Sequence, residues 1–144
     1  METVIKMEKL TRSEAREKIM TILYQINIFN NNNVEYDLTK LIDNNLEVDN
    51  EFVKDIVFGV VTYQQEIDKL ANQYLTDWTI DRLGNTDQAI LRMAIYELLY
   101  TDTPDIVAIN EAIELAKVFS DDSVRKMING TLDKIYKNKV DNGQ

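Results

Sequence analysis

The chain has 144 residues, of which 44% are hydrophobic, one is proline and four are glycine. This length suits a single domain with its own core, and so few turn-forming residues argue against a β-rich fold. The chain contains no cysteine and no histidine, which excludes disulfides, nucleophiles paired with histidine and most zinc sites.

The charge is unevenly distributed along the chain. The net charge is −9, which argues against a nucleic-acid-binding protein that acts alone. Residues 21–124 hold 6 basic and 19 acidic residues, whereas residues 1–20 have a net charge of +1 and residues 125–140 a net charge of +4. Two interpretations fit this pattern equally well: ordinary surface solvation, or a small basic patch for RNA with a broad acidic face for a basic protein.

No part of the sequence is typical of a membrane or export segment. No stretch approaches about 18 consecutive apolar residues. The first residues mix Glu2, Lys6, Glu8 and Lys9 and lack the apolar region of a signal peptide. We therefore expect a cytoplasmic protein with no membrane segment.

The first half of the chain predicts three helices and a short turn. Residues 1–10 are expected to form a flexible lead-in. Thr11 and Glu14 have capping-box spacing, so a helix should begin there and end at the asparagine run 30–33. A short helix is expected over residues 35–45, a long one over 50–75 with Asp49 as its N-cap, and a short turn over 79–83 that begins at Thr79.

Two details of these helices carry further expectations. Arg12 and Arg16 are one turn apart and lie off the apolar stripe, on a face that we expect to be exposed. Gly59 lies inside the helix over residues 50–75, where it costs about 1 kcal/mol relative to alanine. Close packing against another helix would explain why a glycine is tolerated there.

The second half predicts three more helices. Thr86 is expected to cap a helix that ends near Thr101, and a helix over residues 106–119 follows Pro104. A last helix is expected over 123–138, capped by Asp121 or Asp122, with a flexible tail at 138–144. The Asn129-Gly130 pair would normally indicate a turn, but the flanking helical period favours helix. The chain is thus predicted to be all-α, with about seven helices in a single domain, 1–144.

Few residues indicate catalytic chemistry. Glu111 and Glu114 are three residues apart on one predicted helix, and such a pair could bind a metal or act in acid–base catalysis. With 25 acidic residues in the chain, a solvated acidic face is the simpler interpretation, and we expect no metal and no cofactor. Tyr24 and Phe119 could stack on bases, although an aromatic residue in a helical protein more often packs in the core.

Several segments resemble one known protein family. They are residues 87–98 (DQAILRMAIYEL), 104–117 (PDIVAINEAIELAK) and 128–134 (INGTLDK), preceded by Ala15-Arg16-Glu17 and Leu23-Tyr24. In this order and spacing they cover residues 12–136, and they resemble the bacterial transcription antitermination factors of the NusB family.

The resemblance implies both a fold and a function. The fold would be two small perpendicular helix bundles. Members of the family are not enzymes: they pair with NusE, a ribosomal protein, and the pair binds the boxA element of ribosomal RNA leaders. With other Nus factors, this holds the RNA near RNA polymerase and helps it to read through terminators. The acidic middle of the chain would suit NusE, and the basic ends would suit RNA.

The resemblance also implies site residues. Those implied for RNA binding are Arg12, Arg16, Tyr24, Phe119, Ser123, Lys126 and Met127. Those implied for the NusE side are Asp81, Asp87 and Arg92. The chain departs from the family where Ser13 and Glu14 interrupt an arginine-rich run. Two further departures are Met127, where an aromatic residue is common, and Ser123, where an acidic residue is common.

Three other functions remain as alternatives. The chain could be a helical RNA-binding module related to the one that precedes the catalytic domain of some rRNA cytosine methyltransferases. It could be a carboxylate-dependent hydrolase, which would be stabilised by divalent ions on melting. It could also be a purely structural helical dimer, which would not bind RNA even with NusE present.

Overall fold

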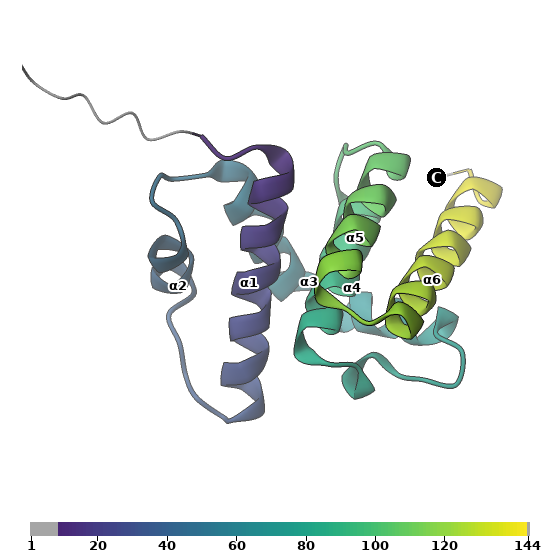
Figure 1. Ribbon diagram of the computed structural model, residues 1–144, viewed down its shortest axis with the longest axis horizontal. Helices are drawn as coiled ribbons and strands as arrows, with labels where there is room; N and C mark the ends of the chain where they lie inside the picture. The colour runs from purple at the N-terminus through teal and green to yellow at the C-terminus, as the bar shows by residue number, and fades with distance from the viewer. Residues whose placement is uncertain (1–8, 144) are drawn as a thin grey trace, which may run out of the picture.

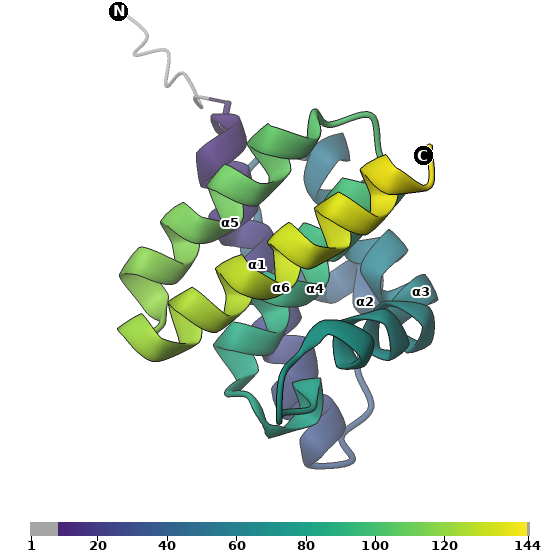
Figure 2. The same cartoon turned by 90° about the vertical axis from the view of Figure 1, so that its right-hand side faces the viewer.

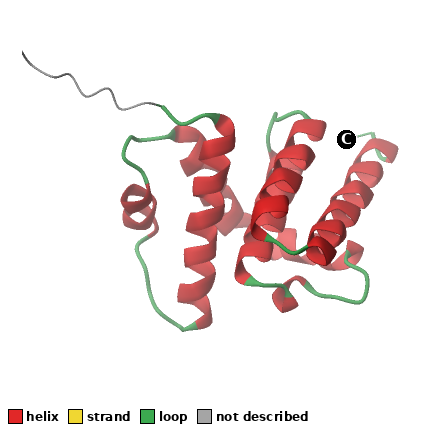
Figure 3. Cartoon of the chain, viewed as in Figure 1, coloured by secondary structure: helices red, strands yellow, loops and turns green. Residues whose placement is uncertain are grey.

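The computed structural model describes residues 9–143, and this part of the chain is helical throughout, without strands (Figure 3). Its elements are α1 (Arg12–Asn31), α2 (Leu38–Asn45), α3 (Glu51–Tyr74), η1 (Ile80–Arg82), α4 (Asn85–Tyr100), α5 (Asp105–Phe119) and α6 (Asp122–Asp141). The prediction of an all-α fold with about seven helices is confirmed. Most of the lead-in expected over residues 1–10 lies outside the described residues.

Helix α4 lies at the centre of the molecule. It contacts α1, α3, α5 and α6, and buried side chains cover it on all sides, as expected for a helix in the middle of a core. In Figure 1, α1 and α2 lie on one side and α5 and α6 on the other, which gives two small helix groups. Figure 2 shows α5 and α6 in front of α4, and all three contact one another.

Capping residues explain where several helices begin. Thr11 and Glu14 form the expected capping box: the Thr11 hydroxyl accepts a bond of 3.1 Å from the Glu14 amide, and the Glu14 carboxylate accepts one of 2.9 Å from the Thr11 amide. These bonds lower the pKa of Glu14. Asp121 caps α6 by accepting from the Val124 amide at 2.9 Å.

Three of the predicted boundaries are wrong. Asn50, not Asp49, caps α3, and Asp49 pairs instead with Lys54. The N-cap of α4 is Gly84, without a side-chain bond, so the predicted cap Thr86 lies inside the helix. Adjacent polar residues are all acceptable caps, and the path of the incoming chain decides which one is used. Helix α6 continues through Asp141, so most of the segment expected as a tail after residue 138 is helical.

Both expectations about glycine are confirmed. Gly59 is buried where α3 packs on α4, and a Cβ atom there would overlap the ring of Tyr96. Gly130 lies inside α6 together with Asn129, so the helical period outweighs the turn signal. In the part of the chain that the structure describes, no helix combines the length and apolar character that a membrane crossing requires.

Candidate nucleic-acid interface

Two of the predicted RNA-binding residues lie exposed on α1. Tyr24 is 40% exposed, in the middle of the helix. Arg12 is exposed at the start of the helix, and its guanidinium carbon lies 4.0 Å from the centroid of the Phe52 ring of α3. A guanidinium at this distance from a ring is attracted to it. The ring therefore holds the Arg12 charge at the surface.

A second group of predicted residues lies at the junction of α5 and α6. Phe119 ends α5, and Ser123 and Lys126 lie in the first turns of α6, all three exposed. Met127 is half-buried and packs against the core, so only part of its side chain is available to a ligand. The Ser123 hydroxyl donates to the capping carboxylate of Asp121 at 2.9 Å, which orients it along the helix end.

Helices α1 and α5 contact each other, so the two groups lie on neighbouring elements (Figure 1). The hollow between these helices has Phe119, Leu115 and Val118 on its wall together with four glutamates, Glu14, Glu17, Glu111 and Glu114. Carboxylates repel phosphate. The hollow therefore offers the Phe119 ring as a stacking face but is unfavourable for phosphate groups.

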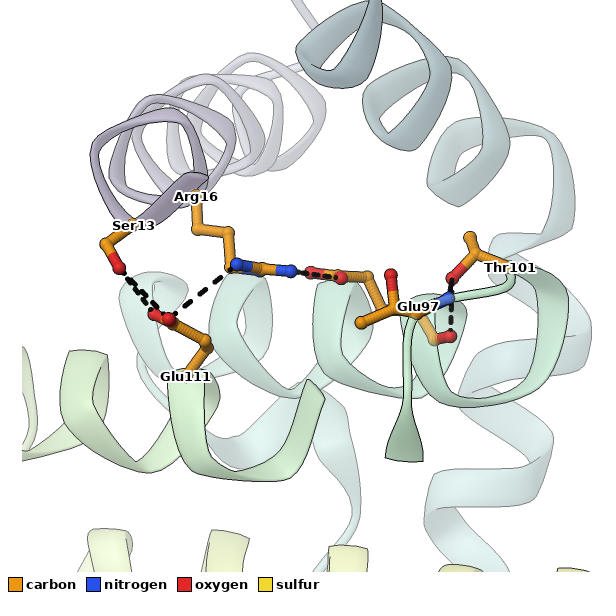
Figure 4. A network of polar contacts seen from close by, with 6 residues as sticks. Ser13, Arg16, Glu97, Thr101 and Glu111 are labelled. Carbon is orange, nitrogen blue, oxygen red and sulfur yellow. Dashed lines mark hydrogen bonds and ion pairs between the residues drawn. The ribbon is translucent and has the colours of Figure 1, made fainter. Parts of the chain in front are cut away.

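Arg16 is not a surface residue, contrary to the expectation. It is 4% exposed and donates to the Glu97 carboxylate of α4 through Nε at 2.7 Å and Nη2 at 2.8 Å (Figure 4). The face of α1 that carries Arg16 meets α4. An arginine can be buried there because Glu97 supplies its counter-charge. The signal in the sequence was Glu97 itself, a lone acid in the apolar second half of α4.

The Arg16 pair belongs to a network that joins α1, α4 and α5. Glu111 of α5 lies 3.8 Å from Arg16 Nη1 and accepts a hydrogen bond of 3.0 Å from the Ser13 hydroxyl (Figure 4). Burial alone would lower the pKa of Arg16, but the bonds to Glu97 and the charges of both carboxylates outweigh it and raise the pKa. Arg16 therefore stays charged and fixes the helix that presents Arg12.

The same network reaches the loop before α5. The Thr101 hydroxyl donates to the Glu97 carbonyl at 2.7 Å and accepts from the Thr103 amide at 3.2 Å (Figure 4). These are local bonds that close the end of α4 and start the turn into Pro104. Two features thus help to position α5: the contacts of Glu111, in the middle of the helix, with α1, and this turn before the helix begins.

The residues predicted for the protein partner also differ in their exposure to solvent. Asp81 is exposed in η1, and Asp87 is half-buried in the first turn of α4, where it accepts from the Ser120 hydroxyl. Arg92 is 6% exposed and donates to the Asp68 carboxylate at 2.8 and 3.0 Å and to Asn27 Oδ1 at 2.8 Å. Arg92 thus ties α1, α3 and α4 together, and it also lines a hollow at the N-terminal end of α4, so its contact with a partner stays a prediction.

The glutamate pair that could have indicated catalysis has separate partners. Glu111 is bound to Ser13 and lies near Arg16, whereas Glu114 pairs with Lys117 at 2.9 Å. Within residues 9–143, no three side chains of the kinds that bind metals gather in one place. The structure therefore gives Glu111 a positioning role and leaves Glu114 at the surface.

Comparison with known proteins decides the family. The family model described as the NusB family matches residues 13–137. The chain belongs to the NusB family. It is 44% identical to the transcription antitermination protein NusB of Macrococcus caseolyticus, over 91% of this chain and all of that protein. It is 42% identical to the one of Halalkalibacterium halodurans, over 87% of this chain and 92% of that protein.

Solved NusB structures have the same fold. The chain matches NusB of T. maritima with a TM-score of 0.78 and 32% identity, over 90% of this chain and 93% of that one. It matches a chain of the crystal structure of antitermination factors NusB and NusE in complex with dsRNA with a TM-score of 0.76 and 25% identity, over 88% of this chain and 96% of that one. The resemblance found in the sequence is confirmed.

Proposed function

We propose that this NusB-family chain is a transcription antitermination factor that binds boxA RNA of ribosomal RNA leader transcripts together with NusE. It acts in the cytoplasm, is not an enzyme, and helps RNA polymerase, in concert with other Nus factors, to read through terminators. The family match over residues 13–137 carries this proposal. Relatives named transcription antitermination protein NusB, and a structural neighbour solved with NusE and dsRNA, support it.

The RNA surface that we propose consists of exposed residues on α1 and at the start of α6. Arg12 and Lys126 supply positive charge, and Tyr24 and Phe119 supply rings on which bases can stack. Ser123 and Met127 lie close to Lys126 in the first turns of α6 and add smaller contacts. Arg16 is buried beneath this surface and acts as a positioning residue, because its bond to Glu97 holds α1 in place.

The NusE surface that we propose lies at the N-terminal end of α4. Asp81 and Asp87 place carboxylates there, and Asp81 and Arg92 line one hollow with Asn85 and Gln88. A basic ribosomal protein would complement the acidic middle of this chain. Because Asp87 accepts from Ser120, one residue after Phe119, this surface is directly connected to the RNA surface.

A gel-shift experiment with boxA-like RNA tests the proposal. We expect weak binding by the chain alone and strong binding with NusE. Arg12→Ala and Lys126→Ala should each weaken binding by the complex, whereas Lys137→Ala, also on α6 and exposed, should not. A complex that binds boxA-like RNA no better than an unrelated RNA, or variants that bind like the original chain, would contradict the proposal.

A further inference from the structure

Three tyrosine rings form a stacked cluster where α3 packs on α4. Tyr63 comes from α3, and Tyr96 and Tyr100 come from α4; we call them the tyrosine patch. The ring centroids of Tyr63 and Tyr100 are 4.8 Å apart, those of Tyr96 and Tyr100 5.2 Å, and those of Tyr63 and Tyr96 6.5 Å. Tyr63 and Tyr100 are each 42% exposed. The patch is therefore a large aromatic area open to solvent.

Two irregularities of α3 build the patch. Gly59 leaves the space that the Tyr96 ring fills, since any Cβ there would overlap it. The backbone departs from helical geometry at Tyr63 itself, with φ −106° and ψ 17°. A mid-helix glycine has an energetic cost. The three rings are thus held together by the backbone and by one another, and differ from independently mobile surface side chains.

Two carboxylates of α3 lie near the rings. Asp55 lies two turns before Tyr63 on α3 and Glu66 one turn after it, and both are exposed. Burial first, and then neighbouring groups that include Asp55, raise the pKa of Tyr96; burial first, and then Glu66, raise the pKa of Tyr100. The Tyr96 and Tyr100 phenols therefore lie close enough to these carboxylates to feel their charge.

One positive charge lies near these carboxylates. Arg12 lines the hollow that also holds Asp55 and Asp102, but its guanidinium lies over the Phe52 ring. The rim of the tyrosine patch thus presents the carboxylates of Asp55 and Glu66, both from α3. Such a rim repels a nucleic-acid backbone and attracts a cation.

We propose that the tyrosine patch is a docking surface for an arginine- or lysine-bearing segment of a second protein partner. A guanidinium or ammonium group is attracted to the faces of tyrosine rings, and the flanking carboxylates complement its charge. Tyrosine is also enriched among the residues that dominate binding at protein interfaces. The aromatic area and the charge of its rim therefore select the same kind of ligand.

The patch is separate from the proposed NusE surface. Asp87 lies in the first turn of α4 and Tyr100 at its end, so at 1.5 Å per residue they are about 20 Å apart along the helix. The two surfaces therefore occupy opposite ends of α4. The inference does not depend on the proposed binding of boxA RNA or NusE.

The test uses the full chain and a synthetic Gly–Ser peptide that carries four arginines. We expect NMR shifts centred on the patch as the peptide is titrated. The double variant Tyr63→Ala, Tyr100→Ala should bind the peptide about tenfold more weakly. The double variant Tyr63→Phe, Tyr100→Phe keeps the rings and should bind normally. Tyr136→Ala, an exposed tyrosine on α6, is the matched control and should also bind normally.

A second pair of substitutions covers the case in which the alanine variant fails to fold. Asp55→Asn with Glu66→Gln leaves the rings in place, and it should weaken peptide binding severalfold and reduce its salt dependence. Unchanged peptide binding in this variant would overturn the proposal. So would a single-stranded RNA oligonucleotide that shifts the patch more than the peptide does, or a loss of NusE binding in a folded alanine variant.

Discussion

Arg12 and Arg16 lie one turn apart on α1, near the same ring, and have opposite surroundings. The Phe52 centroid is 4.0 Å from the Arg12 guanidinium carbon and 5.1 Å from that of Arg16. Arg12 is exposed and meets solvent, whereas Arg16 is buried against Glu97. Their other neighbours explain the difference. The Arg16 guanidinium is paired with the buried Glu97 carboxylate and stabilises the fold, whereas the Arg12 guanidinium is held by the Phe52 ring and can still bind a phosphate.

We predict that Arg16→Ala destabilises the fold by about 3–5 kcal/mol, because it leaves the buried Glu97 carboxylate without its partner. Urea unfolding measures the change. Arg12→Ala should cost much less, and Arg16→Met combined with Glu97→Gln should recover part of the lost stability, since no unpaired charge then remains. Unfolding of Arg16→Ala at the original urea concentration would show that the pair contributes little.

Phe52 is predicted to support RNA binding through Arg12. Phe52→Leu keeps an apolar side chain but removes the ring face, which is worth about 0.5–1 kcal/mol at an exposed site. RNA affinity of the NusE complex should fall by about two- to fivefold. Phe58→Leu, an exposed phenylalanine on the same helix, is the control. If Phe52→Leu weakens binding equally in an Arg12→Ala background, the ring does not act through Arg12.

At the scale of elements, the sequence determines the helices well and their contacts only partly. Apolar periodicity and the Thr11 and Asp121 caps locate α1 and α6, because these signals lie within a few residues of each other. The burial of Arg16 depends on Glu97, which is 81 residues away, and no local pattern reveals that pairing. For the same reason, Tyr24 and Phe119 could be proposed from the family resemblance, whereas the Phe52 contact could not.

Gly59 permits a direct prediction at this scale. Gly59→Ala should destabilise the fold by about 1–3 kcal/mol and Gly59→Leu by more, because each displaces the Tyr96 ring from α3. Gly130 is the matched control, since it lies in α6 and a Cβ atom added there would meet nothing within 4 Å, and Gly130→Ala should stabilise by about 0.4–1 kcal/mol. Thermal melting of Gly59→Ala and Gly130→Ala measures both effects. Equal changes in melting temperature would mean that the contact with Tyr96 is unimportant.

For the whole molecule, the charge distribution assigns different surfaces to basic proteins and to RNA. The middle of the chain, residues 21–124, holds 19 acidic and 6 basic residues, and in the folded structure it supplies the Asp81 and Asp87 end of α4 and the rim of the tyrosine patch. Arg12 and Lys126 come from the basic segments outside it. A protein with this distribution can recruit basic proteins strongly while its own attraction for RNA stays local.

The salt dependence of RNA binding follows from this distribution. A protein of net charge −9 repels a polyanion at long range, and only the two short segments 1–20 and 125–140 have a net positive charge to oppose this. We predict a shallow slope of log K against log salt for the chain alone, at roughly −0.7 per phosphate neutralised on single-stranded RNA. A basic NusE docked on the acidic middle would cancel the repulsion and add phosphate contacts, so affinity and slope should both rise for the complex.

A salt titration of the chain with and without NusE measures both quantities. Equal affinity and equal slope in the two cases would mean that NusE makes no contacts with the RNA. The proposed binding of boxA RNA by this chain together with NusE would then lose its physical basis.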